Sequence, residues 1–407
     1  MIIVQKFGGS SVADLEKIRG VASIIQNEVK NNNQIVVVVS AMFGKTDELL
    51  SMCKNIRPSI DKESMSEYDV VLATGEQITA GLLSLALQNI GISASSLMGW
   101  QIAIKTDSNH TKARIDKLEN INILKNLLKS QNVVICTGFQ GISNENRITT
   151  LGRGGSDTSA IAIGIAINAD RCDLYKDVNG IYTADPKICN KAKKIFNMSH
   201  EEILELSSTG SKILETRAVE MALRYNLDIR VRSTFDLENF GTLVSSKNEN
   251  FGKNKISGIS HTLNEIMVTI SKIQDICGFS NYLFEQFLDN NIGIDMIIQN
   301  EYQNEGKFND FTFVINKSEV DRMMVILLKI KAIYNFFDVQ LKSDIAKISI
   351  VGMKMINESG IASDVFKALL LHSINIFAVS TSDIKISLII KADYTELAIR
   401  VLHDKFI

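Results

Sequence analysis

Two glycine-rich turns carry the residues best suited to chemistry. The first, KFGGSS, starts at Lys6 and follows a short apolar run, and the second, TLGRGGSDTSA, spans residues 150–160. Glycine lets the backbone approach an anion closely, and consecutive N–H groups at a turn or a helix N-terminus can hold phosphate oxygens. The second turn also supplies Arg153, Ser156 and Asp157 just before an apolar segment. Two such turns predict a site that brings two anionic groups together.

Each of these residues also has a purely structural explanation. Lys6 could be a solvated lysine beside an ordinary strand-to-helix turn. Asp157 could serve only as a helix N-cap, and Glu76 could be a first-turn carboxylate stabilised by the helix dipole. These explanations are compatible with a functional role.

The tripeptide Gly44-Lys45-Thr46 resembles the end of a P-loop. That motif requires glycine five residues before Gly44, where this sequence has Val39. We therefore reject a P-loop nucleotide fold, and the phosphate contacts must come from the two glycine turns.

The elements around the turns follow an alternating pattern. Short runs rich in Val and Ile alternate with segments of helical periodicity, which is typical of a mostly parallel sheet with helices on its faces. We predict an α/β fold for residues 1–245. The expected strands are 2–5, 35–39 and 133–136, and the expected helices are 14–31, 76–89 and 157–168.

A polar stretch, SSKNENFGKNK at residues 245–255, predicts a linker. After it, a strand and helix pattern runs once through residues 263–342 and again through 343–407, as two βαββαβ units. The second pass is one strand short, which would leave backbone groups unpaired at a sheet edge. We therefore expect residues 256–261, within a connecting segment 246–262, to complete the second unit.

Bulk composition excludes several classes of protein. The chain has 407 residues, enough for two or three domains, and a net charge of -2 with scattered Lys and Arg, which disfavours a nucleic-acid partner. Five widely separated cysteines argue against a zinc site and a disulfide framework. No apolar run approaches the roughly 20 residues of a membrane span. These features predict a soluble, cytoplasmic protein without a membrane partner.

Six ordered motifs resemble the signatures of aspartate kinases, and the resemblance continues into a regulatory half with two ACT repeats. The motifs are KFGGSSVAD, VSAMFGKTDEL, LATGEQITAGLLSLAL, GWQIAIKTDSNHTKARI, TLGRGGSDTSAIAIG and YKDVNGIYTADPKI, and the ACT repeats are matched by NIGIDMIIQN and STSDIKISLII. The resemblance implies an amino-acid kinase fold followed by two ACT domains. It also implies transfer of the γ-phosphoryl group of ATP to the side chain of L-aspartate, the first step toward lysine, diaminopimelate, threonine and methionine.

This reaction needs no general base. A carboxylate of ordinary pKa, about 3.9, is already ionised at neutral pH, so alignment and charge neutralisation suffice. The resemblance implies that Lys6 and Asp157 are catalytic. It implies that aspartate is bound by Thr46, Glu76, Arg153 and Ser156, with Arg153 on a carboxylate and Glu76 facing the ammonium group.

For ATP, the resemblance implies contacts from Gly8, Gly9, Ser10, Asp177, Tyr182, Lys187 and Lys212. The sequence departs from the family pattern at Lys176, where Thr is usual, at Lys187, where Arg is usual, and at Glu215-Thr216. Lysine keeps the charge of arginine but loses its bidentate geometry. No cluster of His, Asp and Cys has metal-ligand spacing, so we expect no protein-held metal, and Mg²⁺ should arrive with ATP. The histidines, including His110, are expected to have packing or loop roles.

The ACT repeats imply feedback inhibition by lysine or threonine. Gly278, Asp295 and Gln299 match effector-contacting positions, with Asp295 on the effector ammonium, although Gly278 could simply open a helix and Cys277 stands where proline is usual. Such units pair across subunits, which predicts a homodimer or homotetramer.

Two alternatives remain open at this stage. A kinase of the same fold could act on glutamate or acetylglutamate, and substrate competition would decide between them. The departures at Lys176, Lys187 and Glu215-Thr216 could instead indicate a catalytically silent amino-acid sensor, but Lys6, Glu76, Arg153 and Asp157 are all present.

Overall fold

A computed structural model describes residues 1–58, 61–131, 133–210, 213–246, 256–274, 278–290, 292–302, 308–333, 338–352 and 360–407. The described chain forms two compact units. The N-terminal unit comprises residues 1–182, 193–208 and 212–253, and the C-terminal unit comprises residues 183–192, 209–211 and 254–407.

The N-terminal unit is built on an eight-stranded sheet in the order β12-β14-β13-β9-β1-β2-β6-β3. Its central strands are parallel and almost wholly buried, as expected for a sheet covered on both faces. The strands are β1 (Ile2–Phe7), β2 (Gln34–Val39), β3 (Ala94–Leu97), β6 (Val133–Thr137), β9 (Arg171–Lys176), β12 (Asn197–Met198), β13 (Ile229–Ser233) and β14 (Thr242–Val244).

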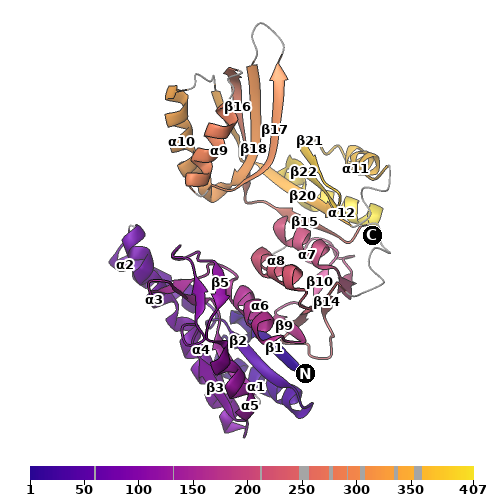
Figure 1. The fold of residues 1–407 in the computed structure, drawn as a ribbon. Helices are drawn as coiled ribbons and strands as arrows, with labels where there is room; N and C mark the ends of the chain where they lie inside the picture. The colour runs from indigo at the N-terminus through magenta and orange to yellow at the C-terminus, as the bar shows by residue number, and fades with distance from the viewer. Residues whose placement is uncertain are drawn as a thin grey trace. The chain divides into compact units, whose positions relative to one another are not determined.

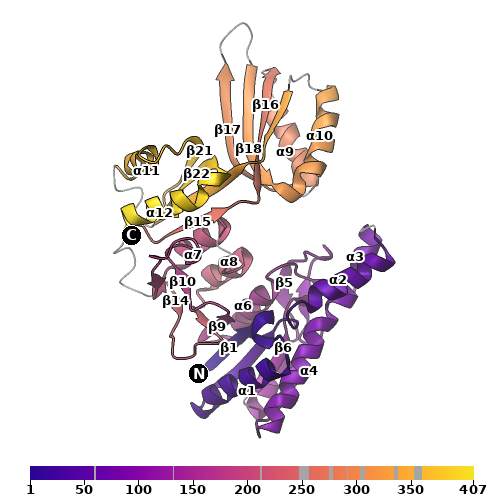
Figure 2. The same cartoon turned by 180° about the vertical axis from the view of Figure 1, so that it is seen from behind.

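Helices cover both faces of this sheet (Figures 1 and 2). On one face, α1 (Leu15–Lys30) and α4 (Thr74–Asn89) bury their apolar side chains against β1, β2 and β6. The opposite face is covered by α6 (Gly155–Ile167), which is buried almost throughout and packs on β1, β2 and β9. The predicted helices 14–31, 76–89 and 157–168 therefore exist, with ends shifted by one or two residues.

Smaller elements surround the sheet edge. The strands β4 (Ile104–Thr106), β5 (Ile115–Leu118), β7 (Gln140–Ser143) and β8 (Ile148–Thr150) form a four-stranded sheet, and β10 (Ile181–Tyr182) pairs with β11 (Lys194–Ile195). The remaining helices are α2 (Lys45–Ile56), α3 (Lys62–Leu72), α5 (Ile121–Ser130), α7 (His200–Ser208), α8 (Thr216–Tyr225) and the short η1 (Gly9–Val12).

One helical stretch, Ser64–Asn89, is long and apolar enough to cross a membrane by length and composition alone. Half of its most apolar window of 18 residues is buried inside the protein. Ala80, Leu83 and Leu87 pack in the core beneath the sheet. The apolar side chains of this helical stretch thus pack in the core of the N-terminal unit.

The C-terminal unit holds two four-stranded sheets, each with two helices. The first has the order β17-β18-β16-β19 and the second β15-β20-β22-β21. The first contains β16 (Glu265–Gln274), α9 (Phe279–Asp289), β17 (Ile294–Tyr302), β18 (Phe308–Asn316), η2 (Lys317–Glu319), α10 (Val320–Ile333) and β19 (Asp338–Lys342). The second contains β15 (Gly258–Thr262), β20 (Ile345–Val351), α11 (Ile361–Leu370), β21 (Ile376–Thr381), β22 (Lys385–Lys391), η3 (Ala392–Tyr394) and α12 (Thr395–Phe406).

The strand β15 pairs antiparallel with β20, from Gly258 opposite Val351 to Thr262 opposite Lys347. It therefore occupies the sheet position that the second repeat lacks. Residues 183–192 also belong to this unit, because Ala184 and Cys189 join the core of the second sheet. The structural division consequently differs from a single cut at residue 245.

Candidate active site

The first glycine turn lies at the carboxyl end of β1, where Lys6 is buried. Its Nζ lies 2.7 Å from Oδ1 of Asp157, and the two side chains are only 7% and 3% exposed. Asp157 stands in the first turn of α6. The parallel sheet and the helix packed on it thus bring together two residues that are far apart in the sequence, the two predicted catalytic residues.

A third charged group completes this cluster. Lys176 ends β9, the neighbour of β1, and its Nζ lies 2.6 Å from Oδ2 of Asp157. The Asp157 carboxylate is therefore held between two ammonium groups. Burial alone would raise the pKa of Asp157, but the Lys176 and Lys6 ammonium groups outweigh it and lower that pKa to about 2. Burial lowers the pKa of Lys6, and Asp157 opposes that shift.

The backbone of the turn fits close to neighbouring chain. A Cβ atom at Gly9 would lie 3.0 Å from the Ala41 carbonyl oxygen, and one at Gly8 would lie 3.7 Å from Lys6 Nζ. Ser10 follows in η1. The glycines therefore allow a backbone turn to lie directly beside the lysine ammonium.

Glu76 lies in the first turn of α4 and is buried. The Ala41 N–H donates to its Oε1 at 2.9 Å, and no donor among the described residues reaches Oε2. Burial raises the pKa of Glu76 to about 8, against the opposing effects of the Ala41 N–H and the Lys6 charge. At neutral pH this carboxyl is mostly protonated until a cation approaches it. Thr46 is half-buried in the first turn of α2.

The second glycine turn presents Arg153 to solvent and buries Ser156. Gly154 has a φ of 75°, and a Cβ atom there would overlap the Glu215 side chain. Ser156 packs so closely on Gly138 that a Cβ atom at that glycine would lie 2.8 Å from it. Close packing on both sides thus fixes the course of the loop that carries Arg153.

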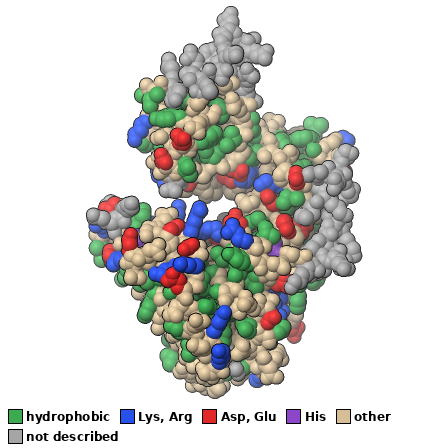
Figure 3. Space-filling view, viewed as in Figure 1, with side chains coloured by type: hydrophobic (Ala, Val, Ile, Leu, Met, Phe, Trp, Pro, Cys, Tyr) green, Lys and Arg blue, Asp and Glu red, His purple; other side chains and the backbone are tan. Residues whose placement is uncertain are grey.

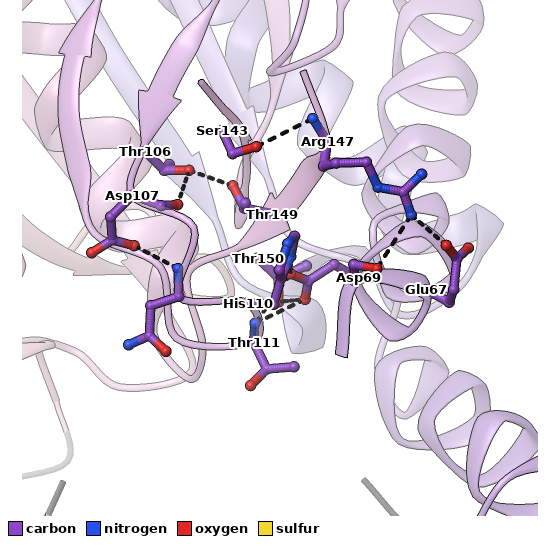
Figure 4. A network of polar contacts seen from close by, with 12 residues as sticks. Glu67, Asp69, Thr106, Asp107, His110, Thr111, Ser143, Arg147, Thr149 and Thr150 are labelled. Carbon is purple, nitrogen blue, oxygen red and sulfur yellow. Dashed lines mark hydrogen bonds and ion pairs between the residues drawn. The ribbon is translucent and has the colours of Figure 1, made fainter. Parts of the chain in front are cut away.

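Asp69 on α3 binds residues of two segments near this loop (Figure 4). This residue was not predicted from the sequence. Its carboxylate is fully buried and accepts hydrogen bonds from the Thr150 hydroxyl at 2.5 Å and from the Thr111 N–H at 3.1 Å. His110 Nδ1 lies 2.8 Å from the same carboxylate, which is the loop role expected for that histidine. The available signal was a single acidic residue in an otherwise apolar helical segment, YDVVLA.

The residues predicted to contact the nucleotide differ in exposure and do not all belong to the same unit. Asp177 is exposed just after β9, and Tyr182 is half-buried on β10. Lys187 is exposed in the segment 183–192 of the C-terminal unit, and Lys212 lies outside the described residues. Glu215 has a structural role: it caps α8 by accepting from the Ala218 N–H at 3.0 Å.

Positive side chains gather on part of the surface of the N-terminal unit (Figure 3). Within the described parts of the chain, no three His, Cys, Asp or Glu side chains are grouped to hold a metal ion. Both oxygens of Asp157 face lysine ammonium groups.

The predicted effector residues lie in the C-terminal unit. Gly278 precedes α9 with a φ of 97°, a backbone conformation that glycine adopts without strain, and Gln299 is exposed on β17. The Asp295 carboxylate already has a partner: its Oδ2 lies 2.5 Å from Nζ of Lys347, which also lies 2.6 Å from Oε1 of Glu265. Cys277 lies outside the described residues.

The models of the amino acid kinase family and of an ACT domain match residues 1–233 and 348–406. An aspartate kinase of Pseudomonas fluorescens is 42% identical, with 100% of this chain and 97% of that protein covered, and aspartokinase 2 of Bacillus subtilis is 38% identical at the same coverage. The fold is similar to that of E. coli aspartokinase III in complex with aspartate and ADP, with a TM-score of 0.84, 24% identity, and 100% and 99% of the two chains covered.

Proposed function

This chain belongs to the aspartate kinase family, and we propose that Lys6, Glu76, Arg153 and Asp157 carry out the family's reaction in it. The reaction transfers the γ-phosphoryl group of ATP to the side-chain carboxylate of L-aspartate and forms an acyl phosphate. The observation that carries the assignment of roles is the buried contact between Lys6 and Asp157 beside the Gly8-Gly9 turn.

Lys6 supplies positive charge to the phosphoryl group in transit. Its ammonium group has three N–H donors. One donates to the Asp157 carboxylate, and the others are left for phosphate oxygens. Asp157, held ionised by its two lysine neighbours, acts as an orienting residue and abstracts no proton. The attacking carboxylate of aspartate is already an anion, so the site stabilises charge and aligns the reactants.

Arg153 and Glu76 recognise the two ends of the amino acid. The exposed guanidinium of Arg153 suits bidentate contact with a carboxylate. The buried Glu76 Oε2, which lacks a donor among the described residues, suits the α-ammonium group. Thr46 and Ser156 add hydroxyl groups at the first turns of α2 and α6.

The nucleotide enters as MgATP, and the ion is carried on its phosphates. Gly8, Gly9 and Ser10 contact the phosphates, while Asp177, Tyr182, Lys187 and Lys212 contact the remainder of the nucleotide or its phosphates. The enzyme acts in the cytoplasm as a homodimer or homotetramer.

The C-terminal unit senses an amino-acid product. E. coli aspartokinase III has been solved in complex with lysine and aspartate, a structure to which this fold is similar with a TM-score of 0.75 at 24% identity. We propose lysine as the first effector to test and threonine as the second, with Gly278, Asp295 and Gln299 as the contacting residues.

The decisive experiment is an assay of the full chain with L-aspartate and MgATP in which hydroxylamine traps the acyl phosphate. We expect aspartate-dependent hydroxamate that lysine or threonine suppresses. Parallel reactions with glutamate and acetylglutamate control for substrate class. Hydroxamate formed only from one of these other acids would overturn the assignment of substrate.

A further inference from the structure

Lys176 is one of the positions at which this sequence departs from the pattern of the sequences it resembles, where threonine is usual. In the structure Lys176 contacts Asp157. The Lys176 ammonium lies 2.6 Å from Asp157 Oδ2, and the Lys6 ammonium lies 2.7 Å from Oδ1. Its side chain is 18% exposed, against 7% for Lys6 and 3% for Asp157. Lys176 is therefore the most accessible member of a largely buried cluster.

The cluster carries an uncompensated positive charge. Two ammonium groups share one carboxylate, so the sum is +1, whereas threonine at position 176 would leave a neutral pair. Removing a net charge from water is costly unless an opposite charge accompanies it. A ligand that balances this charge would be an anion.

The backbone places Lys176 beside the first glycine turn. Phe7 of β1 is opposite Tyr175 of β9 in the parallel register, so the next residues along the two strands are Gly8 and Lys176. A Cβ atom at Gly8 would lie 3.7 Å from both Lys6 Nζ and the Tyr175 carbonyl oxygen. The glycine turn thus lies next to the Lys6 ammonium and to the end of β9 that carries Lys176.

Neighbouring segments also hold the backbone of Lys176 in place. Its carbonyl oxygen accepts a hydrogen bond from the Thr234 N–H at 3.0 Å, and β13 pairs with it on the side away from β1. The Thr234 hydroxyl in turn lies 2.6 Å from that of Ser11, which belongs to η1 after the glycine turn. Strand pairing and this hydroxyl contact hold the lysine and the turn together.

We propose that Lys176 is a second phosphate-binding cation of this active site and contacts the nucleotide phosphates together with Lys6. The inference rests on the proposed function, in which the Gly8-Gly9 turn receives those phosphates. Asp157 anchors one N–H of each lysine, and the remaining donors face the anion.

The test compares nucleotides that differ in phosphate content. Calorimetry would measure the affinity of the full chain for ADP and for adenosine in wild type, Lys176→Met, Lys176→Thr and Lys176→Arg. Losing one charge-assisted contact should weaken ADP binding by about 10- to 100-fold in the methionine and threonine variants. Adenosine affinity should stay unchanged, and arginine should restore most of the ADP affinity.

Unchanged ADP affinity in Lys176→Met, with reduced turnover, would overturn the proposal and leave Lys176 as a residue that only orients Asp157. A loss of aspartate affinity in place of ADP affinity would also overturn it. The melting temperature of each variant shows that it is folded, and the threonine variant serves if methionine disturbs folding. ADP binding is measured without aspartate and therefore tests the role of Lys176 independently of the reaction. If the hydroxamate assay fails while the ADP affinities change as expected, the proposed function is contradicted and the role of Lys176 in phosphate binding is not.

Discussion

Each of the two units contains a buried lysine in a cluster of three charged groups, and the net charges of the two clusters have opposite signs. In the N-terminal unit one carboxylate, Asp157, lies between the ammonium groups of Lys6 and Lys176. In the C-terminal unit one ammonium, that of Lys347, lies between Glu265 and Asp295. The first cluster has a surplus positive charge and the second a surplus negative charge.

The sign of the surplus indicates what each cluster can receive. A positive surplus suits the phosphates of a nucleotide, and a negative surplus suits the ammonium group of an amino acid. Burial differs as well, since Lys347 is 3% and Glu265 15% exposed while Asp295 is 53% exposed. Asp295 is therefore the carboxylate of its cluster that an external ammonium can reach.

The largest expected effect comes from removing one cation of the positive cluster. Lys6→Ala should lower kcat by about a thousandfold or more, because it removes charge stabilisation that is made mainly in the transition state. The fold should persist because Asp157 keeps Lys176 as its partner. Hydroxamate assays and melting temperature measure the two quantities, and the exposed Lys30→Ala serves as control. Near-normal turnover in Lys6→Ala would remove Lys6 from the mechanism.

Removing the central cation of the negative cluster should damage stability and not chemistry. Lys347→Met leaves two carboxylates facing each other, and breaking a buried ion pair from one side costs about 3 kcal/mol when one partner is half-exposed. Urea unfolding followed by circular dichroism measures the loss. The only tryptophan, Trp100, lies in the N-terminal unit, so its fluorescence distinguishes the two units. The exposed Lys329→Met should cost less than about 0.5 kcal/mol, and an equal loss in Lys347→Met would mean that the cluster adds no stability.

The general architecture follows from local patterns in the sequence. Residues 35–39 of strand β2 form an unbroken apolar run, and most of α6 consists of small and branched residues. Both segments are buried, as such patterns predict. The strand β15 could be anticipated because the second repeat lacked a strand, and a sheet edge needs a partner.

The clusters themselves could not be read from the sequence without the resemblance. Lys176 stood out as a departure, but its contact with Asp157 depends on β9 lying next to β1 and on α6 crossing both strands. Asp69 and Lys347 could not be singled out in the sequence, because a charged residue is buried only when partners distant in the sequence surround it. Pairing of this kind is a property of the tertiary fold.

A smaller effect would sharpen the assignment of Asp295. Asp295→Asn keeps the shape but removes the charge that would meet an effector ammonium, so the lysine concentration that halves activity should rise about tenfold. If threonine is the effector, the same shift should appear with threonine. Ile297→Ala, at an exposed position of the same strand that is outside the proposed effector contacts, separates loss of charge from general disturbance of β17. An unchanged inhibition curve in Asp295→Asn would move the effector to another site.

Glu76 is buried in a third way. Among the described residues no cationic side chain lies within hydrogen-bonding distance of it, and burial raises its pKa, which favours the protonated form. Its pKa is raised from 4.5 to about 8, so the substrate-free fold favours the protonated form and should lose stability as pH rises from about 4.5 to 8. Melting temperatures should show this loss in wild type, and Glu76→Gln should flatten it.

The same pKa predicts a proton released when aspartate binds. An ammonium group beside Oε2 favours the ionised carboxylate, so binding at pH 7 should release close to one proton, and the release should vanish above about pH 9, where Glu76 is already ionised. Calorimetric titrations in buffers of different ionisation enthalpy count the protons, with the exposed Glu16→Gln as control. Proton release that persists in Glu76→Gln would assign the ionisation to another group, and binding at pH 7 without release would mean that the ammonium of aspartate lies elsewhere.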